Sequence, residues 1–76
     1  MDTSSHTMQA LFAQLGLSNN ETSIENFIHN NHLPLEIPLE NAAFWSAGQA
    51  QFIHESIALD ADLAEVVDHL DSLLRH

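Results

Sequence analysis

Residues 60–75 contain the most regular apolar pattern in the chain. Their apolar residues recur at the i, i+3, i+4 and i+7 spacing of one helix face, opposite a polar face: Leu63, Val66, Val67, Leu70, Leu73 and Leu74. Asp60 or Asp62 can cap this helix, and Asp71 and Arg75 form an i, i+4 pair. A single domain of 76 residues has little stability to spare, so nearly every apolar stripe must be used in burial.

Two further helices are predicted in the first half of the chain. The first runs from about Ser5 to Leu15 and ends before Gly16, a residue that favours the conformation found just after helix ends. The second begins with a capping box of Thr22 and Glu25 and ends near His32. The candidate caps of the first helix are Thr3, Ser4 and Ser5. The apolar faces of the two helices are Met8, Leu11, Phe12 and Leu15, then Ile24, Phe27 and Ile28.

Two adjacent aromatic residues, Phe44 and Trp45, precede a predicted third helix. Ser46 and Gln49 form its capping box, which places Trp45 at the position where an apolar residue packs against the first turn. This pattern favours a role in the protein's own core. The alternative is contact with a partner, because tryptophan is enriched at interfaces.

The third helix extends to Leu59, and its boundary with the last helix is ambiguous. The apolar residues also fit one unbroken helix from Ala47 to Arg75. Such a rod would be about 43 Å long at about 1.5 Å per residue and would extend beyond so small a core. We therefore expect a break near Asp60.

Between the second and third helices, residues 33–40 (LPLEIPLE) have a period of two. The pattern predicts an extended segment with Leu33, Leu35, Ile37 and Leu39 on one side. Both prolines fall on one edge, so the backbone groups of Leu35 and Ile37 are left free to pair. The favoured interpretation is an extended strap over the helices, and the alternative is pairing with a second copy of the chain.

Charge excludes two classes of partner. Eleven acidic residues oppose a single arginine, Arg75, and lysine is absent, so the formal net charge is −10. Nucleic acids and anionic membranes would be repelled, since their binding requires lysine or arginine. The acids are interpreted as a solvated surface, with mimicry of a nucleic acid as a less favoured alternative.

Few residues have the spacing of a chemical site. His29 and His32, or Glu65 with His69, could serve a small metal- or ligand-dependent enzyme, but neither pair has an identifiable set of further ligands. Residues 60–71 resemble a calcium loop but have Glu65 where that loop requires glycine. Cysteine is absent, which removes disulfide and thiolate chemistry. No catalytic, metal-binding or cofactor-binding residue is assigned.

Three stretches together resemble a known bacterial family: LFAQLGL (residues 11–17), FW-x₃-Q-x₂-F (residues 44–52) and DADLAEVVDHLDSLLR (residues 60–75). The family is catalogued as domain of unknown function twenty-seven eighty-nine, and the resemblance spans essentially the whole chain. It implies a compact, cytoplasmic, proteobacterial domain. It implies no activity and no functional residue.

The sequence therefore predicts one all-α domain, residues 1–76, with four short helices and an extended proline-containing segment between the second and third. The expected function is a non-enzymatic, cytoplasmic module that binds an unknown protein partner or itself, as in a homodimer. Nucleic acid, membrane and cofactors are not expected. The candidate contact residues are Phe44, Trp45, Leu35 and Ile37.

Six histidines lead to a prediction about pH. Protonation of all six changes the formal net charge from −10 to −4 (−10 + 6), so repulsion between copies falls from about pH 7 to about pH 5.5. We expect stronger self-association or lower solubility at the lower pH. Sedimentation velocity at the two pH values measures this change, and identical sedimentation coefficients would contradict the prediction.

Overall fold

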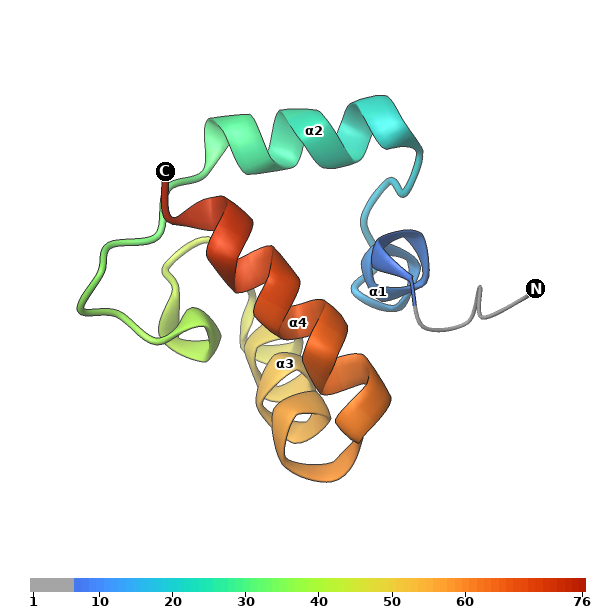
Figure 1. Ribbon diagram of the computed structural model, residues 1–76, viewed down its shortest axis with the longest axis vertical. Coiled ribbons are helices and arrows are strands. Elements are labelled where there is room, and N and C mark those ends of the chain that lie inside the picture. The colour runs from blue at the N-terminus through green and yellow to red at the C-terminus, as the bar shows by residue number, and fades with distance from the viewer. Residues whose placement is uncertain (1–6) are drawn as a thin grey trace.

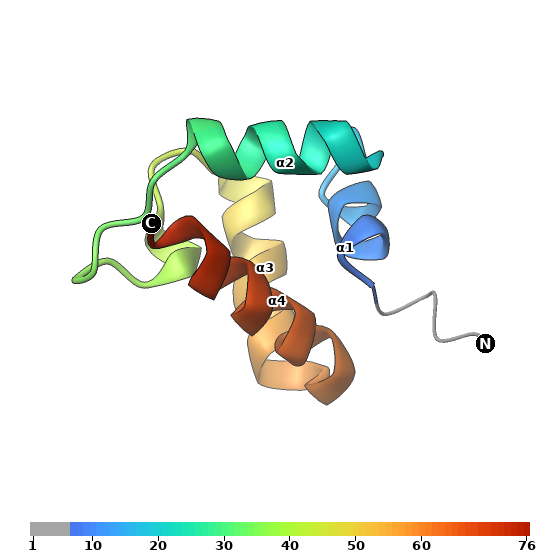
Figure 2. The same ribbon diagram turned by 45° about the horizontal axis from the view of Figure 1, so that its top comes forward.

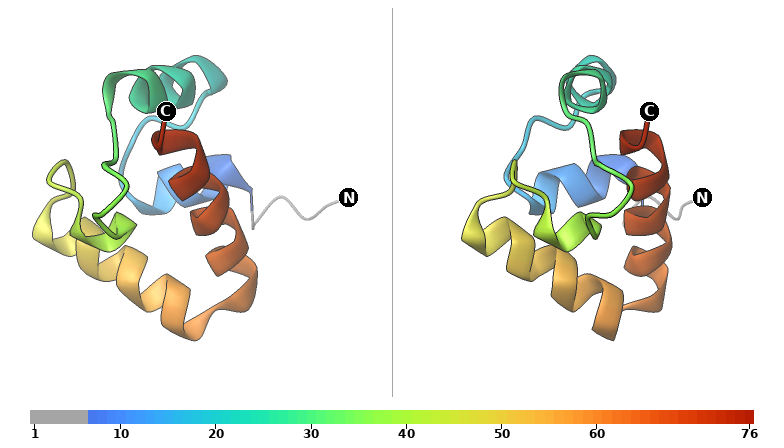
Figure 3. Two further views of the ribbon diagram at one scale, coloured as in Figure 1. Left: turned by 60° about the vertical axis from the view of Figure 1, so that its left-hand side comes forward. Right: turned by 90° about the vertical axis from the view of Figure 1, so that its left-hand side faces the viewer.

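The computed structural model describes residues 7–76, which form four α-helices and no strand (Figure 1). The all-α prediction is therefore confirmed for these residues. The helices are α1 (Met8–Gln14), α2 (Glu21–Asn30), α3 (Ala47–Leu59) and α4 (Ala61–Leu74), with a short 3₁₀ helix, η2 (Leu39–Asn41), before α3. Figures 2 and 3 show α2 lying across the end of the molecule opposite the α3–α4 turn.

Helix α4 is the central element, because it contacts each of the other three helices. Four residues of its predicted apolar stripe are buried: Leu63, Val67, Leu70 and Leu74. They join Leu11 and Phe12 of α1, Ile24 of α2 and Ile53 of α3 in one core cluster. A fully buried leucine in such a core contributes about 2–5 kcal/mol relative to alanine. The pattern of residues 60–75 therefore organises the fold.

The predicted break between α3 and α4 is confirmed at Asp60. This residue adopts an extended conformation (φ −135°, ψ 100°) and ends one helix while it begins the next. Its N–H donates to the Ser56 carbonyl (3.1 Å), and its carboxylate accepts the N–H of Leu63 (3.1 Å). The side chain of Asp60 thus caps α4, and its backbone N–H completes the last turn of α3. The unbroken rod is not formed, and Asp60 rather than Asp62 is the cap.

Helix α1 ends as the sequence predicts. Gly16 has φ +76°, where a side chain would be strained. The N–H of Leu17 donates to the Phe12 carbonyl (2.9 Å), and that of Gly16 to the Ala13 carbonyl (3.1 Å), as in a Schellman motif. The start differs from the prediction, because Thr7 is the N-cap and accepts the N–H of Ala10. The predicted caps Thr3, Ser4 and Ser5 lie outside the described residues.

Helix α2 starts two residues earlier than predicted, because its cap is Asn20 and not Thr22. The Asn20 side chain accepts the N–H of Ser23 (2.8 Å), and its carbonyl accepts the N–H of Ile24 (3.0 Å). The earlier cap is favoured because it adds helical hydrogen bonds to the same segment. At the other end, Asn31 is extended (φ −126°, ψ 130°) and its side-chain amide donates to the Phe27 carbonyl (2.8 Å), so the helix ends at Asn30, two residues before the predicted end near His32.

The prediction of an extended strap over residues 33–40 is wrong for residues 34–37, which form a turn. The N–H of Ile37 donates to the Pro34 carbonyl (3.1 Å), which closes a turn and places Leu35 at its tip, 84% exposed. Leu33 and Leu39 are buried as expected and Ile37 packs partly buried against the core, so the alternation fails only at Leu35. The predicted free edge is also wrong, because both backbone groups of Ile37 are bonded within the chain. The backbone groups of Ile37 are therefore not free to pair with a second copy.

Arg75, the chain's single lysine or arginine, holds this turn against the end of α4. One guanidinium nitrogen donates to the Pro34 carbonyl (2.6 Å) and another to the Ile37 carbonyl (3.0 Å). Nε donates to the carboxylate of Asp71, which confirms the predicted i, i+4 pair. The N–H of Leu33 adds a backbone bond to the Leu74 carbonyl (2.9 Å). The proline segment is thus attached to α4 by side-chain and backbone bonds.

This arrangement predicts that Arg75→Gln destabilises the isolated protein by about 1–3 kcal/mol, because charge-assisted hydrogen bonds to two carbonyls are lost. Arg75→Lys retains the charge but lacks the planar fork that reaches both carbonyls, so it should recover only part of the loss. Urea unfolding measures both variants. If the free energy of unfolding of Arg75→Gln is within about 0.5 kcal/mol of that of wild type, the turn does not depend on these bonds.

Candidate interaction site

The aromatic pair predicted as a contact candidate lies mainly inside the protein. Trp45 is only 8% exposed, and its indole N–H donates to the Leu39 carbonyl (2.9 Å). Its ring stacks on Phe27 with centroids 5.6 Å apart, and Phe44 packs edge-on against both rings. The capping box of Ser46 and Gln49 is present, as predicted. The interpretation of Trp45 as a core residue is therefore confirmed.

The four candidate contact residues differ in their access to solvent. Trp45 is buried, Phe44 and Ile37 are half-buried, and Leu35 is exposed at the tip of the turn. Among the four, Leu35 therefore has the largest exposed fraction. A contact role for these residues stays a prediction.

A core role for Trp45 predicts that Trp45→Phe destabilises the isolated protein by about 1–3 kcal/mol. The smaller ring leaves a cavity, and the Leu39 carbonyl loses the indole donor and keeps only the Ala42 N–H (3.1 Å). Leu35→Ala is the control and should change stability by less than about 0.5 kcal/mol. Thermal or urea unfolding measures both. Equal stability of the two variants would contradict the core role of the indole N–H.

A groove of about 800 Å³ lies between α1, α2 and the C-terminal part of α4, and it is open to solvent. We call it the α1–α2–α4 groove. Met8 of α1, Ile24 and Ile28 of α2 and Leu73 of α4 provide its apolar lining. Leu73 belongs to the predicted core stripe of α4, yet it is 39% exposed because this groove leaves its side uncovered. The groove is the candidate interaction site.

Polar side chains line the edges of the groove. Glu21, Glu25 and His29 follow one another at intervals of four residues along α2, so they form one row on its surface. Gln9 contributes from α1. His76 lies at the end of α4, and its Nε2 is 2.9 Å from the Ile28 carbonyl and 3.2 Å from that of Asn31. Since both partners are acceptors, Nε2 carries the hydrogen and caps the end of α2.

The family model described as "Protein of unknown function (DUF2789)" matches residues 1–74. The chain belongs to this family. The resemblance seen in the sequence is thus confirmed over nearly the whole chain. No curated protein and no solved structure matched the chain.

The histidines of this DUF2789 protein occupy different surroundings. The His32 and His76 rings meet with centroids 5.5 Å apart, while His29 lines the groove. Glu65 and His69 are both exposed on α4, and residues 61–71 are helical throughout, which is incompatible with a calcium loop. Within residues 7–76, no three histidine or acidic side chains are grouped so that they could hold a metal ion.

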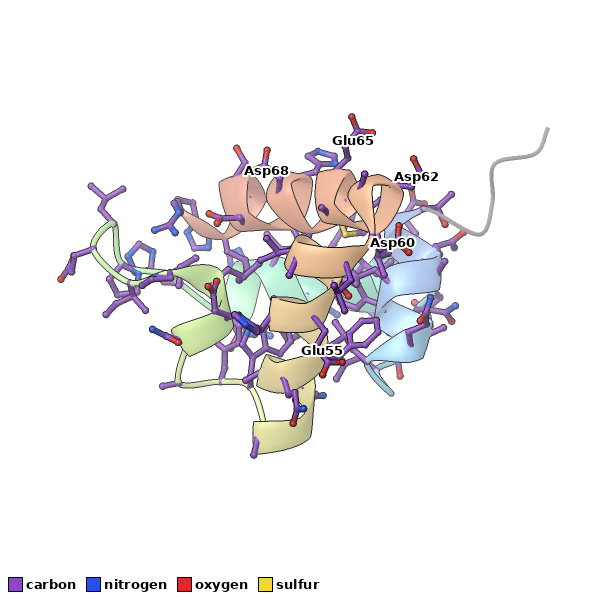
Figure 4. All side chains as sticks on the ribbon, turned by 90° about the horizontal axis from the view of Figure 1, so that it is seen from below. Glu55, Asp60, Asp62, Glu65 and Asp68 are labelled. Atoms are coloured by element: carbon purple, nitrogen blue, oxygen red, sulfur yellow. The ribbon has the colours of Figure 1, made fainter. Side chains whose placement is uncertain are left out.

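The DUF2789 chain also carries an acidic face around the α3–α4 turn. Figure 4 labels its five exposed members, which are Glu55 on α3, Asp60 at the junction, and Asp62, Glu65 and Asp68 on α4. Because this turn and α2 lie at opposite ends of the molecule (Figure 1), the face is separate from the acidic edge of the groove. In the part of the chain that is described, no helix is both long and apolar enough to cross a lipid bilayer.

The sequence patterns identified the apolar residues of the groove but not the groove itself. Ile24, Ile28 and Leu73 were all assigned to core faces. One feature of the sequence indicated that part of the α4 stripe would stay uncovered. Leu73 and Leu74 are adjacent in the sequence, so their side chains point in different directions from the helix. Leu74 is buried, whereas Leu73 faces the groove.

Proposed function

We propose that this DUF2789 protein is a small, acidic, non-enzymatic module of the cytoplasm that binds a protein partner in the α1–α2–α4 groove. The observation that carries the proposal is the groove itself, an apolar depression between three helices with Leu73 left 39% exposed in its wall. An apolar groove between helices is a common recognition surface for an amphipathic segment of another protein. The absence of cysteine means that the fold needs no disulfide, which suits a reducing compartment.

The groove suits a protein segment better than a small substrate. Sites for small molecules enclose about 70–90% of the ligand surface, whereas this groove is open on one side. Of its titratable residues, Glu21, Glu25 and His29 form a row along one edge, and His76 has its Nε2 bound to the carbonyls of Ile28 and Asn31. A row along an edge suits the flank of an elongated partner, while a catalytic site needs groups that converge on one reacting atom.

Affinity capture from native lysate with three matched variants tests the proposal. Leu73→Gln removes an apolar contact from the groove without a change of charge, and we expect recovery of the partner to fall about fivefold or more. Leu35→Gln and Leu59→Gln change the two most exposed leucines, which lie outside the groove, and should leave recovery unchanged.

Two results would contradict the proposal. Loss of the partner with Leu35→Gln, but not with Leu73→Gln, would move the contact to the proline turn. Stoichiometric zinc in the purified protein would favour the metal-dependent enzyme instead. Far-UV circular dichroism of each variant confirms that the fold is retained.

A further inference from the structure

The acidic edge of the groove lacks cationic partners within the described part of the chain. Glu21 and Glu25 are exposed and lie one helical turn apart on α2, so both carboxylates are presented on the same side. The ion pair found among residues 7–76 is that of Asp71 with Arg75, and it involves neither glutamate. Ile24 and Ile28 run beside the two glutamates and line the groove. The α2 wall therefore combines an apolar row with an unpaired acidic row.

A second copy of the chain is poorly suited to this surface. Arg75 is its single lysine or arginine, and that guanidinium is already bound to Asp71, Pro34 and Ile37 with its side chain only 21% exposed. Each copy carries a formal charge of −10, with histidines counted as neutral. A copy in the groove would therefore bring acids toward Glu21 and Glu25, and like charges at an interface oppose binding.

An extended peptide is also disfavoured, because residues 7–76 form no sheet whose edge could accept a strand. A helix fits the arrangement better. Apolar side chains at i, i+3, i+4 and i+7 can occupy the lining formed by Met8, Ile28 and Leu73. Lysines or arginines one turn apart on the flank of that helix match the one-turn spacing of Glu21 and Glu25.

We infer, on the basis of the proposed function, that the occupant of the α1–α2–α4 groove is a cationic amphipathic helix of another protein. The apolar lining supplies the area to be buried, and Glu21 and Glu25 set the charge and orientation of the partner. Complementary charges of this kind contribute more to specificity and association rate than to total affinity.

The probe is a synthetic helical peptide with leucines at i, i+3, i+4 and i+7 and lysines on the flanks. Its matched control has glutamate at every lysine position. Binding to the full chain is measured by fluorescence anisotropy at about pH 7 and about 0.15 M salt, where unspecific attraction between distant charges is screened. We expect the lysine peptide to bind at least about tenfold more tightly than the glutamate peptide.

Two double variants with the same change of charge locate the contact. Glu21→Gln with Glu25→Gln should weaken binding of the lysine peptide by about two- to tenfold. Glu55→Gln with Asp68→Asn neutralises two exposed acids outside the groove, on the face shown in Figure 4, and should change binding by less than about twofold. Leu73→Gln should weaken binding of the lysine peptide as well.

Equal weakening by the two double variants, or no preference for the lysine peptide, would overturn the inference. So would a dimer at about pH 7 that becomes tighter in Glu21→Gln/Glu25→Gln, because the occupant would then be a second copy. If the lysine peptide fails but Leu73→Gln still abolishes capture of the native partner, the groove is correct and the partner chemistry is wrong. If Leu73→Gln changes neither measurement, the proposed function itself fails.

Discussion

The contact of Arg75 with the proline turn is the interaction on which the arrangement of the second half of the molecule depends. The guanidinium binds the carbonyls of Pro34 and Ile37 while its Nε remains paired with Asp71. Proline cannot donate a backbone hydrogen bond, so a segment that contains Pro34 and Pro38 has few donors of its own with which to bind its neighbours. Its carbonyls remain, and the single arginine of the chain satisfies two of them.

The position of the proline segment in turn determines the aromatic cluster. The segment continues into η2, whose Leu39 carbonyl accepts the indole N–H of Trp45. Trp45 stacks on Phe27 of α2, which also meets Phe12 of α1 edge-on. Contacts that begin at the end of α4 are thus linked through the segment to α2 and α1. The groove forms on the side of α4 where this network does not reach, and there Leu73 stays partly exposed.

Local patterns in the sequence were sufficient for the helices and for several of their ends. The stripe of residues 60–75, the Ser46–Gln49 capping box, Gly16 and the break at Asp60 all depend on residues close in sequence, and each is confirmed. The turn at residues 34–37 was not predicted, because it is stabilised by Arg75, which lies 41 residues from Pro34. The groove was also not predicted, since it depends on how α1, α2 and α4 pack. A helical pattern shows which side chains share a face but does not show whether a neighbour covers all of it.

The junction at Asp60 has a consequence for how the chain can change in evolution. A single non-helical residue separates α3 from α4, so the connection contains no slack to absorb a change of length. Because each residue turns an α-helix by about 100°, one inserted or deleted residue near this point would rotate Leu63, Val67, Leu70 and Leu74 away from the core together. Substitutions at exposed positions of these two helices are far better tolerated than length changes, and the spacing between Ile53 and Leu63 is therefore fixed by the geometry of the bend.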